Sequence, residues 1–387
     1  MFNYIPLTIL VESNSESYKK EIEKFRSVFN LFENYDQKGL SNDKAEESNL
    51  EINEKLQNLP LFINKSGKSS IKLQLPTSHF DGYNMWFLKC TQFNRGKGIY
   101  VFNRLEQLVS LLTEINKGIV LSEANEIINQ NVDTTKRQAM QGFNSADASQ
   151  PKIQSSTFVI QKYIEKPLLI NHRKFDIRVW VLITNSLKVY FFKEGYLRTS
   201  CEVFSLSQEN ITNESVHLTN NAIQINSENY GKFEDGNQIS FAQLQEYFDA
   251  NYSHMKISVR NDIVEEMKKL VTLTFLSSRD HFSTQNKSSS FEIFGFDFII
   301  DESFKTWLIE VNTNPCLEES SPLLKSLLPR MLDDAFKLTI DQMFRKKRKN
   351  LAQDDPDTLD LTKKSSKYQD FPVEGYTDNE NLWEIIL

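Results

Sequence analysis

The alternation of apolar and polar positions predicts several β-strands. Residues 294–300 and 306–311 are rich in aromatic and β-branched side chains, and the polar segment 301–305 joins them, which predicts an antiparallel hairpin. Residues 158–164 and 175–183 predict two further strands, and residues 4–11 predict an early one. The chain therefore has the pattern of a mixed α/β protein in which antiparallel strands predominate.

Apolar residues at helical spacing follow and precede these strands. They predict helices within residues 105–131, 240–252, 259–278 and 320–344. The polar stretch 130–156 is interpreted as a long mobile loop, either a lid over a ligand or an inert insertion. Residues 187–201 predict a hairpin that turns at Glu194 and Gly195 and places Arg198 on the returning strand.

Three charged residues, Lys174, Asp176 and Arg178, alternate with apolar residues on one predicted strand and so share a face. They would be simply exposed in an average sheet. The apolar run 179–184 indicates burial instead, and buried charges need partners. A nucleotide would supply them.

Acidic and amide side chains interrupt the predicted hairpin. Glu310 and Asn312 are two positions apart and project from one face, while Asp297 falls opposite Ile309 or Glu310. Two carboxylates and an amide oxygen suit Mg²⁺. The alternative is a structural sheet in which these acids pair with Lys or Arg.

A glycine loop connects two short predicted strands in residues 84–102. Gly96 and Gly98 permit close backbone approach to phosphate, and Lys89 and Arg95 could bring positive charge to the same anion. A tight hairpin with surface cations explains this pattern equally well. Further along, Thr219 and Asn220 could cap a helix or bind phosphate, and the preceding histidine is interpreted as a packed or capping residue.

Composition narrows the class of protein. The 387 residues carry a formal net charge of −7, which argues against a general nucleic-acid binder. The three cysteines are widely scattered, so they indicate neither a disulfide framework nor a metal site. No stretch approaches the roughly 20 apolar residues of a membrane span. We therefore expect an intracellular protein that acts without membrane or nucleic acid.

Several motifs occur in a characteristic order: WFLK with NRGKGI, QKYIEKPLLI with RKFDIR, KEGYLRT, HLTNNAIQ with NYGKFEDGNQISF, and FEIFGFDF with WLIEVNTNP. Together they resemble the tubulin-tyrosine ligase family over residues 4–344. The resemblance implies an ATP-grasp fold, an α/β (α+β) class in which two mainly antiparallel sheets flanked by helices hold the nucleotide. It also implies a shortened N-terminal portion (1–80), a central domain (81–170), a C-terminal domain (171–345) containing the hairpin 291–317, and a flexible polar tail (346–387).

The resemblance also implies roles for residues that match the family's motifs. Arg178 is expected near the γ-phosphate, and Arg198 near the carboxylate of the amino acid or acceptor. The expected Mg²⁺ ligands are Asp297, Glu310 and Asn312. The expected ATP-binding residues are Lys89, Arg95, Gly96, Lys97, Gly98, Ile99, Gln161, Lys162, Tyr163, Ile164, Lys174, Asp176, Thr219 and Asn220, with residues 161–164 lining the adenine through a strand edge.

By the same resemblance, the protein is expected to be an ATP- and Mg²⁺-dependent ligase. It would add tyrosine, glutamate or glycine to a protein carboxylate through an acyl-phosphate. Tubulin is the expected acceptor, which would place a monomeric enzyme on cytoplasmic microtubules or in cilia. The alternatives are a catalytically silent microtubule-binding relative and an ATP-grasp ligase with a non-tubulin acceptor. One departure is Cys90, where the family usually has proline.

Overall fold

The computed structural model describes residues 3–36, 51–56, 75–80, 82–93, 95–117, 119–120, 152–153, 155–282, 290–344 and 371–387. The chain divides into two compact units. Unit 1 consists of Met1–Asp176, Arg198–Phe233 and Ile299–Ile309, and unit 2 consists of Ile177–Leu197, Glu234–Phe298 and Glu310–Leu387. The contiguous domains expected from the sequence are a different division, and their boundaries stay a prediction. The expected loop 130–156 lies largely outside the described residues.

The four-stranded sheet of unit 1 has the order β1-β6-β2-β3. Its strands are β1 (Thr8–Glu12), β6 (Thr157–Lys162), β2 (Trp86–Cys90) and β3 (Ile99–Phe102), and each adjacent pair is antiparallel.

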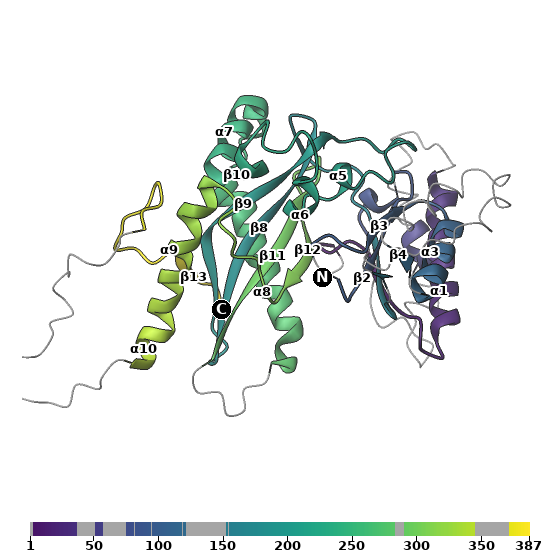
Figure 1. The fold of residues 1–387 in the computed structure, drawn as a ribbon, viewed down its shortest axis with the longest axis horizontal. Coiled ribbons are helices and arrows are strands. Elements are labelled where there is room, and N and C mark those ends of the chain that lie inside the picture. The colour runs from purple at the N-terminus through teal and green to yellow at the C-terminus, as the bar shows by residue number, and fades with distance from the viewer. Residues whose placement is uncertain are drawn as a thin grey trace, which may run out of the picture. The chain divides into compact units, whose positions relative to one another are not determined.

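Two helices, α1 (Tyr18–Asp36) and α3 (Leu105–Lys117), lie side by side against this sheet (Figure 1). Strict alternation along β2 explains the arrangement: Trp86 and Leu88 are fully buried in the helix-covered core, whereas Phe87 and Lys89 project from the opposite face. That opposite face carries the candidate chemistry.

The remaining short elements of unit 1 are β4 (Ile119–Val120), β5 (Lys152–Ile153), β7 (Leu169–Ile170), η2 (Thr77–His79), α5 (Glu214–His217) and α6 (Asn221–Gln224). Residues 51–56 are also helical.

A second sheet has the order β10-β9-β8-β11-β12, with β13 paired to β9 and β7 to β8. Its long strands are β8 (Arg173–Thr184), β9 (Val189–Val203), β11 (Phe291–Ile300) and β12 (Thr306–Asn312), and its short ones are β10 (Gln238–Ser240) and β13 (Trp383–Ile385). The two strands of the predicted hairpin are confirmed as β11 and β12. Each of the four long strands runs from one unit into the other.

Helices complete unit 2. They are α7 (Phe241–Asn251), η5 (Asp235–Asn237), η6 (Ser253–Met255), η7 (Val259–Ile263), α8 (Val264–Ser278), η8 (Arg279–His281), α9 (Pro322–Leu338) and α10 (Ile340–Phe344). Leu324, Leu327 and Met331 of α9 pack against Trp180 and Phe192 of the sheet and form an apolar cluster with them. A capping box at Ser240 fixes the start of α7.

The predicted turn at Glu194 and Gly195 is wrong, because β9 runs straight through both residues. The turn lies instead at Thr184–Lys188, where Leu187 adopts a φ of 59°. Gly195 is needed for close packing rather than for a turn. A Cβ atom there would lie 2.6 Å from the backbone oxygen of Arg178 and 2.7 Å from the ring of Phe241.

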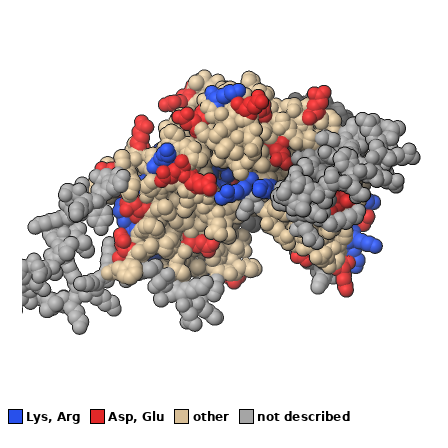
Figure 2. Space-filling view, in the orientation of Figure 1, with Lys and Arg blue, Asp and Glu red and all other residues tan. Residues whose placement is uncertain are grey.

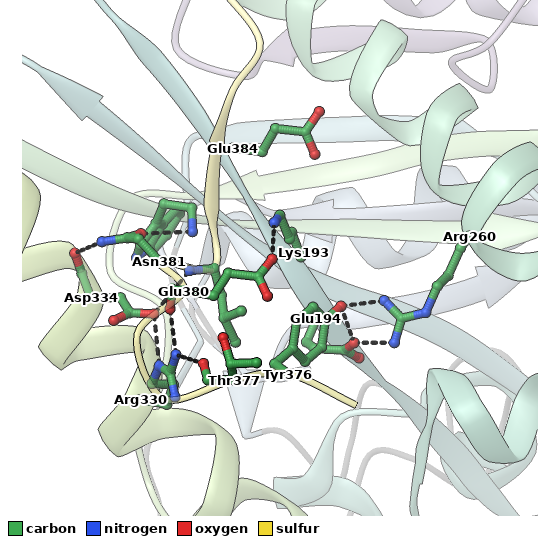
Figure 3. A network of polar contacts seen from close by, with 12 residues as sticks. Lys193, Glu194, Arg260, Arg330, Asp334, Tyr376, Thr377, Glu380, Asn381 and Glu384 are labelled. Carbon is green, nitrogen blue, oxygen red and sulfur yellow. Dashed lines mark hydrogen bonds and ion pairs between the residues drawn. The ribbon is translucent and has the colours of Figure 1, made fainter. Parts of the chain in front are cut away.

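Residues 371–387 pack onto unit 2, in place of the flexible tail expected there; residues 345–370 lie outside the described part. β13 pairs with β9, and Leu382 and Trp383 enter the apolar cluster. Figure 3 shows how polar contacts fix this segment: Arg330 of α9 pairs with Asp334 and donates to three backbone oxygens, those of Phe371, Thr377 and Glu380. We call residues 371–387 the C-terminal clasp.

Side chains of both charges are distributed over the face drawn in Figure 2, in keeping with the modest net charge. None of the described helices is both long and apolar enough to cross a bilayer.

Candidate active-site residues in two units

In unit 1, Lys89 and Lys174 are brought to one aromatic ring. Their ammonium nitrogens lie 5.6 and 5.4 Å from the centroid of Phe87. Lys89 also donates to the side-chain oxygen of Gln161 (2.7 Å), which lies directly across from Phe87 in the β2–β6 pair. The family resemblance implied nucleotide contacts for both lysines, and the fold brings Lys89 of β2 and Lys174 of β8 to the same ring.

Lys174 is buried among neutral acceptors. It donates to the hydroxyl of Tyr163 (3.2 Å) and to the backbone oxygen of His217 (2.7 Å). Burial lowers the pKa of Lys174 to about 7; the charge of Asp176 opposes this shift and that of Lys89 adds to it. An anion beside Lys174 would raise its pKa again and favour the charged ammonium. The charged ammonium can then bind a phosphate group.

The glycine loop lies against the segment that contains Asn220. Gly96 has a φ of 84°, and a Cβ atom there would lie 2.9 Å from Ile223 and 3.1 Å from the side-chain oxygen of Asn220. Arg95 and Gly98 also have positive φ values, of 59° and 70°. This left-handed backbone turns successive amide groups in a way that glycine tolerates and that can form an anion-binding concavity.

Of the residues 161–164 predicted to line the adenine, Gln161 and Lys162 end β6, which lies between β1 and β2 rather than at a sheet edge. The backbone amide of Lys162 donates to Leu7 and that of Tyr163 to Met85. The side chain of Lys162, which is only 1% exposed, is paired with Glu165 in the interior. Sequence reasoning could not detect this, since β1 is far away in the chain. The adenine-binding role of these residues stays a prediction.

Arg198 and Asp176, also of unit 1, form a two-pronged ion pair. The Nε atom of Arg198 donates to one carboxylate oxygen at 2.8 Å, and a terminal nitrogen donates to the other. Both side chains are largely buried. Asp176 thereby fixes the orientation of the planar guanidinium.

The three predicted metal ligands come together in unit 2. The amide nitrogen of Asn312 lies 3.1 Å from Glu310 and 3.5 Å from Asp297, and Asp297 is itself paired with Arg178, directly opposite it in the β8–β11 register. Gly295 makes room for this pair, because a Cβ atom there would lie 3.2 Å from the Arg178 Nε atom.

These residues fit a hard cation in their chemistry. Reversing the Asn312 amide would present its oxygen beside two carboxylates, the donor set that Mg²⁺ uses when phosphates and water complete its shell. Within the described ranges, no three His, Cys, Asp or Glu side chains gather closely enough to hold a metal. An amide or ligand oxygen is therefore required. Arg178 would meanwhile orient the Asp297 carboxylate.

Sequence reasoning underestimated His217, which was interpreted as a packed or capping residue. It is buried, but it also links three parts of the site: its Nδ1 atom lies 3.0 Å from the Tyr163 hydroxyl, its Nε2 atom lies 2.9 Å from the Asn210 backbone oxygen, and its own carbonyl holds Lys174. Its position two residues before Thr219 in the HLTNN motif was the available signal.

Comparisons with known proteins agree with the motifs. The model of the tubulin-tyrosine ligase family matches residues 13–350. Tubulin glycylase 3D of Tetrahymena thermophila is 29% identical over 309 residues, covering 78% of this chain and 25% of that protein. Tubulin glycylase 3A of Drosophila melanogaster is 32% identical over 283 residues (70% and 24%), and protein monoglycylase TTLL8 of Mus musculus is 31% identical over 281 residues (71% and 29%). The chain thus spans about a quarter of the length of these relatives.

Proposed function

Because the chain belongs to the tubulin-tyrosine ligase family, we propose that it joins an amino acid to a protein carboxylate at the expense of ATP. The acceptor carboxylate would attack the γ-phosphorus and release ADP, giving an acyl-phosphate. The amino group would then attack the acyl carbon, lose a proton and displace phosphate. The observation that carries this proposal is the cation and carboxylate set, two lysines over Phe87 and the Arg178–Asp297 pair beside Glu310 and Asn312.

The residues act by positioning and by neutralising charge. Lys89 and Lys174 would bind phosphate oxygens, and the glycine loop would supply backbone amides to the same group. Arg178 would face charge that develops on the transferred phosphoryl group, and Arg198 would hold a carboxylate of the amino acid or acceptor. Asp297, Glu310 and Asn312 would hold Mg²⁺, which screens phosphate charge when bound.

We further propose glycine as the amino acid and an acidic tubulin tail as the acceptor. The relatives named above, which are tubulin glycylases and a protein monoglycylase, support this choice over tyrosine and glutamate. Action on microtubules, including those of cilia, follows from that acceptor.

The test is to incubate the purified chain with tubulin, Mg-ATP and glycine, glutamate or tyrosine in turn, and to locate added mass by peptide spectrometry. Mass gain by glycine on a tubulin tail is expected. Gain with another amino acid would correct the donor, and ATP consumption without tubulin would indicate a different acceptor. No gain despite ATP binding would indicate a silent relative.

The metal assignment is tested by Glu310→Gln, which keeps the side-chain shape and removes the charge. We expect Mg-ATP-dependent ligation to be lost while the thermal unfolding midpoint stays close to that of the wild type. Glu302→Gln, in the exposed hairpin loop, is the matched control. Undiminished turnover of the Glu310 variant would exclude this metal site.

A further inference from the structure

We propose that Tyr163 and His217 are positioning residues for the ATP-binding Lys174. They form a relay of uncharged hydrogen-bonding groups that runs from the backbone oxygen of Asn210 to the lysine ammonium. The inference rests on the proposed nucleotide binding and extends it, since neither residue need touch the reacting atoms.

The direction of every hydrogen bond in the relay follows from one fixed point. The Asn210 backbone oxygen is only an acceptor, so the His217 Nε2 atom, 2.9 Å away, carries the proton. In a neutral imidazole the Nδ1 atom is then an acceptor, and the Tyr163 hydroxyl, 3.0 Å away, donates to it. The phenol oxygen therefore accepts from Lys174 at 3.2 Å. Each of these hydrogen bonds therefore has only one possible donor and one possible acceptor.

The protonation states agree with this order. Burial lowers the pKa of His217 to about 4, the charge of Lys174 adding to the shift and the Asn210 contact opposing it. Burial, with the charge of Glu165, raises the pKa of Tyr163 well above its usual range. Both groups therefore stay neutral at physiological pH, so the relay presents lone pairs to Lys174 without a countercharge.

Tyr163 and His217 fix the position of the Lys174 ammonium from two sides. Phe87 stacks on Tyr163 with ring centroids 4.6 Å apart, and the Lys174 ammonium lies 4.6 Å from the Tyr163 centroid. The carbonyl of His217 takes a second N–H of Lys174 at 2.7 Å. In the described part of the chain no third acceptor lies within hydrogen-bond distance of this ammonium. One N–H thus remains for a phosphate oxygen.

Neutral acceptors make the charge of Lys174 depend on its ligand. The charged groups that act on it are Asp176 of β8 and Lys89 of β2, which have opposite effects, while Tyr163 and His217 contribute dipoles only. With a pKa of about 7 in the free protein, Lys174 would take up a fraction of a proton when an anionic nucleotide binds. A lysine paired with a carboxylate would already be charged and would take up none.

Tyr163→Phe tests the relay, because it retains the stacked ring and removes only the hydroxyl. Mg-ATP binding to the full chain is measured by titration calorimetry at about pH 6 and about pH 8.5, in buffers of different ionisation enthalpy. We expect affinity to fall about 3- to 10-fold, the loss of about one hydrogen bond. We also expect a larger proton uptake near neutral pH, because the ammonium has lost an acceptor. Tyr190→Phe, a phenol on β9, should change neither quantity.

His217→Leu should act in the same direction, whereas His217→Asn should restore part of the effect. The asparagine side-chain oxygen can replace the Nδ1 atom as the acceptor for Tyr163. A merely structural role of either residue would lower affinity equally at both pH values and leave proton uptake unchanged, and that result would overturn the relay.

A ligand-free measurement separates the relay from nucleotide binding. Carbon-13 NMR of labelled lysine side chains, with Lys174→Met identifying the resonance, follows the titration of Lys174 directly. Tyr163→Phe should lower its midpoint. If the midpoint moves but wild-type protein fails to bind ATP, the proposed function is wrong and the relay stands. An unmoved midpoint in a variant that still binds ATP would contradict the relay.

Discussion

Two of the buried cations, Lys174 of unit 1 and Arg330 of unit 2, have hydrogen-bond partners of opposite kinds. Arg330 of unit 2 is paired with Asp334 and donates to backbone oxygens of the C-terminal clasp. Lys174 of unit 1 is held by a phenol and a carbonyl. The contacts of Arg330 therefore include a carboxylate, whereas the two hydrogen-bond acceptors of Lys174 are both uncharged. This difference supports Lys174, and not Arg330, as a residue that binds an anionic ligand.

Of the variants that test this comparison, Arg330→Leu should have the largest effect on stability. It would leave the buried carboxylate of Asp334 without its main partner and remove three contacts to the clasp, so we expect the free energy of unfolding to fall by about 3–5 kcal/mol. Denaturant unfolding measures this. Arg26→Leu, which breaks an exposed pair with Glu23 in unit 1, is the control and should cost less than about 1 kcal/mol. Equal losses in the two variants would show that the clasp network contributes nothing special.

Lys174→Met should have a large effect on ATP affinity and a small one on the free energy of unfolding. Loss of a charged hydrogen bond to phosphate predicts a 10- to 100-fold weaker Mg-ATP affinity, corresponding to about 1.5–3 kcal/mol. The free energy of unfolding should fall by much less than in Arg330→Leu, because a buried charge is removed together with its contacts. Calorimetry and denaturant unfolding of the same samples test both points. Unchanged ATP affinity would contradict the assignment of Lys174 as a ligand.

The pH dependence of stability should distinguish the two cations. The pKa of Lys174 in the folded chain, about 7, lies below its value in an unfolded chain, about 10.4. Between these values the unfolded state binds more protons, so the free energy of unfolding rises with pH by at most about 1.4 kcal/mol per unit. The penalty is fully present below about pH 7. Denaturant unfolding at about pH 7 and pH 9 should show a larger rise in wild-type protein than in Lys174→Met.

The smallest effect is expected at the rim of the clasp. Lys268 of α8 contacts Glu384, whose side chain is 43% exposed, and also Glu265. Glu384→Gln should therefore lower the free energy of unfolding by less than about 1 kcal/mol, and less at high salt. A loss as large as that of Arg330→Leu would mean that ion pairs at the rim, rather than the buried arginine, hold the clasp.

Local sequence patterns sufficed to predict which side chains share a face when the residues lie on one strand. The period of two predicted that Glu310 and Asn312 share a face, and their side chains lie 3.1 Å apart. The same period linked Lys174, Asp176 and Arg178. The partners of these residues could not be predicted, because the pairing of Arg178 with Asp297 depends on the register of strands separated by more than a hundred residues.

The failures have a common physical origin in packing. Glu194 and Gly195 have turn composition, but the glycine permits β9 to pass close to Phe241 and the backbone of Arg178. The clasp has polar composition, yet Val373, Leu382 and Trp383 anchor it in the apolar cluster, and its backbone oxygens accept hydrogen bonds from Arg330. His217 is packed, as the sequence indicated, but its contacts with Tyr163 and Asn210 could not be predicted, because no spacing rule connects these residues to it.

The course of β8, β9, β11 and β12 through both units has a consequence for the gene. Each unit is encoded by three separated stretches, and the boundaries fall inside strands, as between Leu197 and Arg198. No single fragment of the open reading frame encodes either unit alone, and a premature stop before residue 371 removes the clasp from unit 2. Loss of any one of these four strands would therefore remove residues from both units.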